Sequence, residues 1–283
     1  MSQARERFDG GARDETPPPP PPALRIEVVD AHCHLDLMDG DVAANVAAAQ
    51  AVGVRRVVTI GIDVPTSQWS AQAAQEHSDV YAAVAMHPNE AHLADDAALV
   101  EIARLAGLPA VVAVGETGLD FYRQSATEAQ QQASFRAHIQ IAKDSGKALV
   151  IHDREAHDAV LQALADEGAP ERVVFHCFSG DAAMARRCAD LGYVMSFAGN
   201  MTFKNAQHLR DALVVAPLDL LLVETDAPFL TPMPHRGQPN APYLIPLTVR
   251  AMASVKAVDE DELAAALAAN AAAVFALPTA TTG

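Results

Sequence analysis

Eight short runs rich in Val, Ile and Leu recur along the chain, and each is followed by a longer stretch with helical periodicity. The runs cover residues 26–34, 54–60, 80–87, 110–116, 148–152, 172–178, 193–197 and 219–226. The helical stretches cover roughly 41–52, 66–77, 95–106, 127–145, 155–167, 181–191, 203–215 and 246–275, with a break near Val258. Apolar strands that alternate with helices predict parallel pairing, because each crossover helix covers one face of the sheet.

Eight strand–helix units in about 255 residues match the size of a TIM (β/α)8 barrel. A doubly wound open sheet is the structural alternative, but the strand count favours the barrel. We therefore predict an α/β protein whose single folded domain, residues 24–283, is such a barrel.

Residues 1–23 form a different kind of segment. They contain charges, glycines and six consecutive prolines, so they offer little apolar surface to bury. We predict a disordered tail in which the prolines form a stiff polyproline II rod. A docking site for a proline-binding module is the alternative use of this segment.

Composition limits the partners of the chain. There are 20 Lys and Arg against 36 Asp and Glu, which gives a net charge of −16 and argues against coating nucleic acid or anionic membrane through bulk charge. No apolar run reaches the ~18–20 residues of a membrane span. Three cysteines do not make a disulfide scaffold, so we expect a cytoplasmic protein. A barrel of this size is stable alone, so we expect a monomer.

Polar side chains gather where the predicted strands end. In a barrel, the carboxyl ends of all strands meet at one mouth, and active sites lie there. So many imidazoles and carboxylates at one end are difficult to place in a core, and together they predict a metal site. The residues are Asp30, His32, His34, His87, Glu116, His152, His176, Glu224 and Asp226.

Strand alternation separates these residues from the neighbouring cysteines. Side chains two positions apart point to the same face, so His32 and His34 both point into the mouth and Cys33 points outward. By the same reasoning, Cys177 points away from His176. Both thiols are therefore expected to be packing residues, with thiolate ligation as the alternative.

Four His, one Glu and one Asp exceed the needs of one tetrahedral ion. Two divalent ions that share the carboxylate of Glu116 would use all of them, and a single ion is the alternative. We assign one ion to His32, His34, Glu116 and Asp226, and the other to Glu116, His152 and His176. Imidazole with carboxylate suits Zn, Mn and their neighbours better than Mg, so the identity of the metal stays open among Mg, Mn and Zn.

Two neighbouring divalent ions suit the hydrolysis of a phosphate ester by an activated water. Asp226 or Glu224 would accept the proton of that water, and Glu224 has the alternative role of holding a ligand His. His87 would hydrogen-bond a substrate phosphate, unless it serves a local structure beside Pro88. Among the few basic residues near the mouth, Arg236 is the best candidate for a phosphate contact.

Seven sequence blocks carry a resemblance to a known family. They are DAHCHLD (30–36), MHP (86–88), GETGLDFYR (115–123), IHDR (151–154), FHCFSG (175–180), ETDAPFL (224–230) and RGQPNAP (236–242). In this order and spacing they resemble the TatD family of metal-dependent deoxyribonucleases, which belong to the amidohydrolase-like barrels. The resemblance implies a two-metal phosphodiesterase that acts on DNA ends, often as a 3′ to 5′ exonuclease. It also implies that the six residues assigned above bind the metals and that His87 lies near catalysis.

Two other functions remain to be weighed. One is an amidohydrolase-type enzyme that cleaves a C–N or ester bond in a small molecule or an aminoacyl ester. Many two-metal amidohydrolases bridge their ions with a carboxylated Lys at the end of the fourth strand, and Glu116 occupies that position here, which favours the nuclease-like group. The other is a non-enzymatic, metal-bound adaptor, which has no need for converging ligands at an open site.

Overall fold

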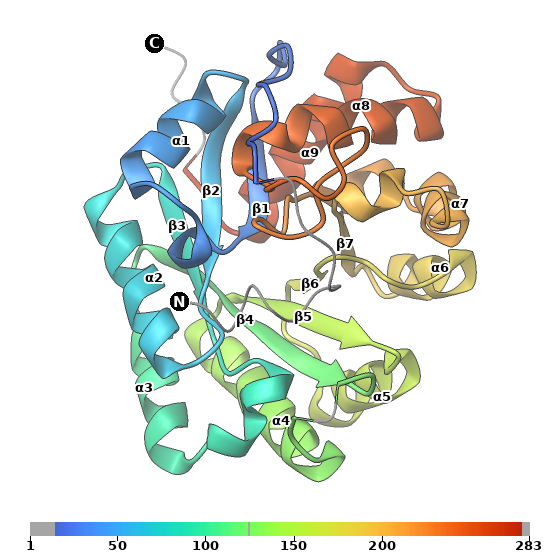
Figure 1. Ribbon diagram of the computed structural model, residues 1–283. Coiled ribbons are helices and arrows are strands. Elements are labelled where there is room, and N and C mark those ends of the chain that lie inside the picture. Colours follow the sequence, from blue (N-terminus) through green and yellow to red (C-terminus); the bar gives the residue numbers. More distant parts are fainter. Residues whose placement is uncertain (1–14, 124, 279–283) are drawn as a thin grey trace.

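The computed structural model describes residues 15–123 and 125–278. In this part of the chain, eight parallel strands pair in sequence order. They are β1 (Val28–Cys33), β2 (Val54–Ile60), β3 (Val80–Val84), β4 (Val111–Asp120), β5 (Ala148–Arg154), β6 (Val173–Phe175), β7 (Val194–Phe197) and β8 (Leu221–Val223). Figure 1 shows the strands in the middle of the molecule, with the helices around them. The predicted TIM-like barrel is confirmed.

The described helices follow the strands as the periodicity predicts. They are α1 (Val42–Gln50), α2 (Val64–Glu76), α3 (Asp96–Ala106), α4 (Glu128–Ser145), α5 (His157–Glu167), α6 (Ala182–Asp190), α7 (Gln207–Val215), α8 (Ile245–Lys256) and α9 (Glu260–Val274). Short 3-10 turns lie at η2 (Leu35–Leu37), η3 (Pro88–Leu93), η4 (Gly199–Thr202), η5 (Leu218–Leu220) and η6 (Pro242–Leu244).

The ring of strands closes between the segment after β8 and the end of β1. Cys33 and Ala227 form a parallel bridge. The backbone N–H of Asp226 donates to the carbonyl of His32 (2.9 Å), and the N–H of His34 donates to the carbonyl of Ala227 (2.8 Å). The closure therefore sets His32, His34 and Asp226 side by side.

Two apolar layers hold the barrel together. One fills its interior with alternate strand residues such as Val58, Ala113 and Val150, and Phe275 from the end of α9 packs against it. The other lies between strands and helices and includes fully buried residues such as Phe135. Removal of this apolar surface from water is the main source of the free energy that stabilises the fold.

Side chains at the starts of the helices fix where they begin. Asp63 accepts the backbone N–H of Thr66, whose hydroxyl in turn bonds the N–H of Asp63, and Thr127 and Gln130 form the same box at α4. The break near Val258 is confirmed: α8 ends at a left-handed Ala257, and Asp259 caps α9.

Among the strands whose predicted and observed lengths differ, β4 and β8 matter most for the mouth of the barrel. β4 runs on to Asp120, because its last residues pair with β5, with Gly118 opposite His152 and Asp120 opposite Arg154. β8 stops at Val223, because the chain turns out of the sheet towards Asp226, whose φ is +54°. Both differences lie at the mouth of the barrel.

The proline-rich segment differs from the predicted disordered tail. Over residues 15–23 the chain lies on the barrel instead of apart from it. The hydroxyl of Tyr243 donates to the carbonyl of Pro18 (2.7 Å), and the guanidinium of Arg250 donates to the carbonyl of Pro22 (2.9 Å). Proline lacks an N–H but keeps its carbonyl, so such a segment can dock as an acceptor. The rest of the predicted tail, residues 1–14, lies outside the described residues.

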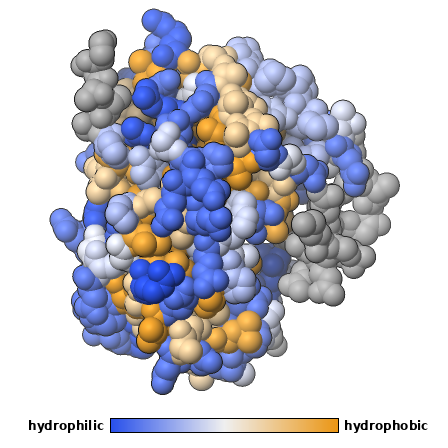
Figure 2. Space-filling model, turned by 90° about the vertical axis from the view of Figure 1, so that its left-hand side faces the viewer, coloured by the Kyte–Doolittle hydropathy of each residue, from blue (hydrophilic) through white to orange (hydrophobic). Residues whose placement is uncertain are grey.

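Among the described residues, no helix is both long enough and apolar enough to cross a bilayer. On the side that carries α1, α2 and α3, apolar side chains are interspersed with hydrophilic ones (Figure 2).

Candidate metal centre

The six predicted metal ligands converge at the carboxyl end of the barrel. His32 lies in β1 and His34 directly after it, Glu116 in β4, His152 in β5, His176 just after β6, and Asp226 after β8. Five different strands therefore contribute to one cluster. Its side chains are largely buried, with His32 fully so and Asp226 the more exposed carboxylate.

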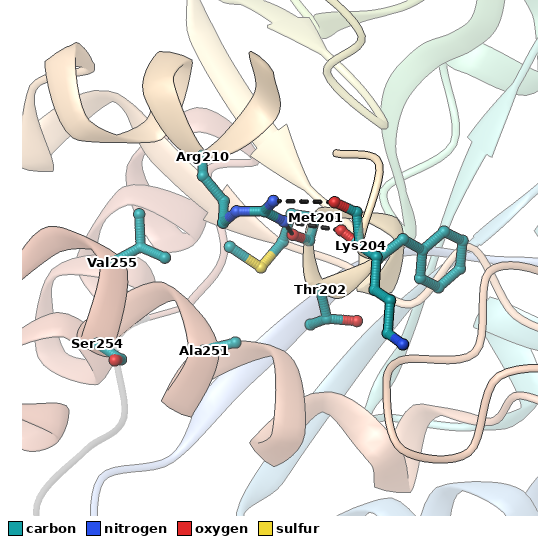
Figure 3. Close-up of a pocket in the computed structure, with 8 residues that line it drawn as sticks. Met201, Thr202, Lys204, Arg210, Ala251, Ser254 and Val255 are labelled. Carbon is teal, nitrogen blue, oxygen red and sulfur yellow. Dashed lines mark hydrogen bonds between the residues drawn. The ribbon is translucent and has the colours of Figure 1, made fainter. Parts of the chain in front are cut away.

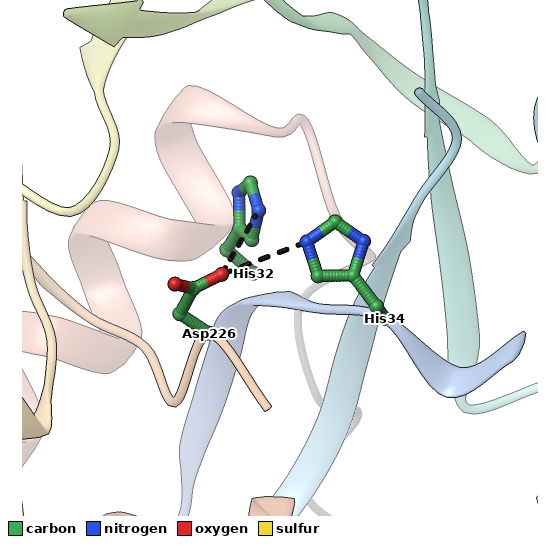
Figure 4. Close-up of side chains that lie close together, drawn as sticks. All are labelled: His32, His34 and Asp226. Atoms are coloured by element: carbon green, nitrogen blue, oxygen red, sulfur yellow. Dashed lines mark ion pairs between the residues drawn. The ribbon is translucent and has the colours of Figure 1, made fainter. Parts of the chain in front are cut away.

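His32, His34 and Asp226 surround a common point, and Figure 4 shows both rings turned towards the carboxylate. Oδ1 of Asp226 lies 3.7 Å from Nε2 of His32 and 3.6 Å from Nε2 of His34. Ligand atoms about 2.1 Å from a tetrahedral ion stand about 3.4 Å apart, so these separations match neighbouring ligands of one ion.

Glu116 stands between the two predicted ligand sets. Its Oε2 lies 3.6 Å from Nε2 of His32. Its Oε1 is hydrogen-bonded to Nδ1 of His152 (2.6 Å) and to Nε2 of His176 (2.7 Å). One carboxylate thus uses a different oxygen for each set. The first set has ligand spacing, whereas in the second the imidazoles contact the carboxylate directly.

The buried ring of His32 gives an independent test of whether the site suits a cation. Within residues 15–123 and 125–278, neither of its ring nitrogens has a hydrogen-bond partner. A buried polar atom without a partner costs about 1–3 kcal/mol. Burial and the charge of His176, whose ring stacks on it at 3.9 Å, both lower the pKa of His32, which favours the neutral form that binds a metal.

The two carboxylates of the centre are ionised. Burial alone would raise the pKa of Glu116, but the charges of His176 and His87 hold it well below its usual range. Burial likewise opposes ionisation of Asp226, but its contact with His34 and the charge of His32 keep its pKa below the usual value. Two ionised carboxylates that face several imidazole nitrogens make a strong site for a divalent cation.

Glu224 lies beside His176, on the side of the ring away from Glu116. It is fully buried, and its Oε1 accepts from the backbone N–H of Cys177 (2.8 Å) and lies 3.2 Å from Nδ1 of His176. These contacts fix the ring of His176, with Nε2 directed at Glu116. The geometry agrees with the alternative in which Glu224 holds a ligand His.

His87 lies at the same mouth. Its Nδ1 accepts the backbone N–H of Asn89 (3.0 Å), so the neutral ring carries its proton on Nε2. That Nε2 lies 3.4 Å from Oε1 of Glu116 and 3.3 Å from Nδ1 of His152. Both predicted roles are compatible with this position, because one nitrogen serves the local turn while the other faces the centre.

Two buried acids support the centre, although the sequence alone assigned neither of them a role. Oδ2 of Asp120 lies 3.3 Å from Nε2 of His152, on the side of the ring away from Glu116. Asp30 accepts both the N–H (2.9 Å) and the hydroxyl (2.6 Å) of Thr225 and so anchors the turn that carries Asp226. Strand alternation would have indicated both acids, because Asp30 lies on the same strand face as His32, and Asp120 on the same face as Glu116.

Arg236 and the cysteines complete the set of predicted residues. The guanidinium of Arg236 lies over the ring of Phe203, 4.3 Å from its centre. Cys33 is buried and its thiol bonds the carbonyl of Val58, as expected of a packing residue. Cys177 is only half-buried, with a φ of +41°. Neither thiol belongs to a cluster with ligand spacing in the described part of the chain.

A closed ring of eight parallel strands with imidazoles and carboxylates at one mouth defines a barrel hydrolase of the amidohydrolase-like type. The family of "TatD related DNase" matches residues 29–276, and the chain belongs to this family of metal-dependent hydrolases.

Individual relatives agree with this assignment. The chain is 46% identical over 259 residues to the "Uncharacterized metal-dependent hydrolase TatD" of Mycobacterium tuberculosis, a match that covers 88% of this chain and 98% of that protein. It is 38% identical to the "Uncharacterized metal-dependent hydrolase YcfH" of Escherichia coli K12, over 88% of this chain and 95% of that one. Among solved structures, the TatD homologue YJJV of Escherichia coli superposes with a TM-score of 0.84 at 29% identity, over 89% of this chain and 98% of the other.

Proposed function

We propose that this chain hydrolyses phosphodiester bonds at DNA ends, with two divalent cations at the centre around Glu116. The observation that carries the proposal is the carboxylate of Glu116, which faces His32 with one oxygen and His152 and His176 with the other. A carboxylate whose two oxygens face different ligand sets would be shared by two ions. The "DNase" in the name of the family supports the choice of substrate.

Divalent ions bound here would supply a water of lowered pKa and positive charge opposite the phosphate. Asp226 is the general base of the proposal, because it is ionised and is the more exposed carboxylate of the centre. Glu224 is instead a positioning residue, since its Oε1 is engaged by His176 and Cys177.

Substrate contacts in the proposal come from residues around the centre. His87 donates its Nε2–H to a phosphate oxygen, because its Nδ1 is occupied by the N–H of Asn89. Arg236 contacts a second phosphate, since in the described part of the chain no carboxylate pairs with it. The resemblance of the chain to its family adds the direction of cleavage, from the 3′ end towards the 5′ end.

The test uses single-stranded DNA labelled at either end, incubated with the protein and Mg or Mn. We expect early release of the 3′ label as a mononucleotide and no release in the presence of a chelator. Asp226→Asn lowers the rate about 100-fold or more, because it removes the general base. Asp219→Asn, a change of the same kind in the exposed η5 turn before β8, leaves the rate unchanged.

Equal release by wild type and Asp226→Asn would refute the proposal. So would turnover of amides or carboxylic esters by a protein that leaves DNA intact. First release of the 5′ label would overturn only the direction of cleavage.

A further inference from the structure

Most described arginines are bound by acids or backbone carbonyls. Arg25, Arg55, Arg104, Arg136, Arg187 and Arg250 form ion pairs with carboxylates. Arg56, Arg172, Arg186 and Arg210 donate to backbone carbonyls. Arg154 and Arg236 differ, because their guanidinium groups lie over aromatic rings, 4.2 Å from the centre of Tyr122 and 4.3 Å from the centre of Phe203.

The first stack stands beside the metal centre on β4 and β5. Arg154 is the last residue of β5, two positions after His152, so both side chains leave the same face of the strand. It is paired in register with Asp120, which contacts His152. Tyr122 follows β4 and is 60% exposed, an unusual position for an aromatic ring unless it serves a contact.

The second stack lies where β7 and β8 end. Phe203 follows η4, and Arg236 comes from the loop after β8, which is held to η4 by a bond from the N–H of Met233 to the hydroxyl of Thr202 (2.8 Å). Phe203 also lines an open cavity with Ser179 and Asn200, which follow β6 and β7.

The backbone under the second stack is hydrogen-bonded to Arg210. Figure 3 shows the adjoining pocket, in which Arg210 reaches back to the η4 segment, and its guanidinium donates to the carbonyls of Met201 (2.9 Å) and Phe203 (2.8 Å). Lys204 adds an exposed positive charge next to the ring. A fixed aromatic ring with cations beside it offers both a stacking surface and a phosphate contact.

Each nucleobase of a DNA strand has two flat faces, and the sugar that carries it is linked to a phosphate on each side. Unpaired bases stack on aromatic rings and guanidinium planes whatever their sequence, whereas the bases of a duplex already stack on one another. Within residues 15–123 and 125–278, neither Arg154 nor Arg236 forms an ion pair with a carboxylate, although the chain has a net charge of −16.

We propose that the stacks Arg154–Tyr122 and Arg236–Phe203 bind unpaired bases and adjacent phosphates of single-stranded DNA on either side of the metal centre. This inference rests on the proposed function for the identity of the substrate, and it makes the enzyme selective for single strands and frayed ends.

Binding is measured without metal, so that it is independent of cleavage. A fluorescein-labelled single strand of about 12 nucleotides, and the blunt duplex of the same sequence, are titrated with protein in EDTA at low salt and followed by anisotropy. The single strand is expected to bind more tightly. Tyr122→Ala and Phe203→Ala each weaken its binding roughly 5-fold to 150-fold, the range that one base–aromatic stack contributes.

Matched variants separate stacking from other effects. Tyr122→Phe and Phe203→Tyr keep a ring and retain the wild-type dissociation constant, and so does Val100→Ala, which truncates an apolar side chain that is 70% exposed on α3. Arg236→Gln lowers the salt dependence of binding, by about 0.7 in the slope of log K against log salt for each lost phosphate contact. Melting temperatures confirm that each variant is folded.

Equal affinity for the duplex, no binding by the wild type, or unchanged binding by both alanine variants would overturn the inference. Failure of the proposed function gives a different result. A protein that binds single strands through these rings but does not hydrolyse DNA would refute the proposed function and leave this inference standing.

Discussion

Replacing Gly118 by Ala tests whether the contact between β4 and β5 sets the position of His152. A Cβ at Gly118 would lie 2.1 Å from the carbonyl oxygen of His152, which is 1.3 Å closer than the 3.4 Å at which ordinary contact begins. The φ of Gly118, +141°, is also one that side chains rarely adopt. The obstacle is backbone, so the strands themselves have to separate.

The size of the effect follows from this displacement. A shift of about 1 Å in a group that positions the reaction can cost about 100-fold in rate. We therefore expect Gly118→Ala to lower the metal affinity and the proposed hydrolysis of DNA about 100-fold. Strain and loosened strand pairing lower the free energy of unfolding by roughly 1–3 kcal/mol.

Calorimetric titration with Mn measures the metal affinity, and urea unfolding measures stability. Gly146→Ala is the control, because Gly146 also has a positive φ (+65°) but a Cβ there would meet nothing within 4 Å. It should lose about 1–2 kcal/mol of stability and keep its metal affinity. Wild-type metal affinity in folded Gly118→Ala would refute the reasoning.

Three further predictions concern single side chains. Asp120→Asn weakens metal binding about 10-fold to 100-fold, measured by calorimetry, because it removes the acid that orients His152. His138 is fully buried, and its burial lowers its pKa from 6.5 to about 4, so its neutral form stabilises the fold above pH 6.5 and this contribution is lost as the pH falls towards 4. Urea unfolding at both pH values should show that His138→Gln removes up to roughly 3 kcal/mol of this acid sensitivity, and an unchanged pH profile would contradict the assignment. Tyr243→Phe removes the hydroxyl that bonds the carbonyl of Pro18; it should cost about 1 kcal/mol and speed proteolysis of residues 15–23, and equal cleavage rates would count against docking of that segment.

The barrel could be predicted because its signal is local and repeated. Each strand is a short apolar run and each helix a longer stretch, often rich in Ala, so their alternation alone gives the order of elements. The end of β8 was harder to predict, because Glu224 and Asp226 follow the apolar run with the alternation of a strand. Where the chain leaves the sheet, Thr225 is held by the distant carboxylate of Asp30 and by the side chain of Asn240.

The convergence of the candidate ligands was predictable for the same reason. Once His32, Glu116 and Asp226 are assigned to strand ends, the barrel topology alone brings them to one mouth. The acids that hold the imidazoles in place depend on contacts across the fold, such as Glu224 with His176. Strand alternation places such acids on the face of the ligands, but which imidazole each acid contacts follows only from the folded chain.

The proline-rich segment shows a different limit. Composition correctly predicts that residues 15–23 form no helix or strand, but it does not reveal that their carbonyls meet donors on distant residues. Tyr243 and Arg250 supply these donors more than 200 positions later in the chain.

Metal content is the sharpest test of whether Glu116 lies between two divalent ions. Wild-type protein and Glu116→Gln are saturated with Mn, freed of unbound metal and analysed by mass spectrometry of the metal. We expect about two ions per wild-type chain and a loss of bound metal in the variant. One ion or fewer per wild-type chain at saturation, or an undiminished content in folded Glu116→Gln, would contradict the two-ion centre.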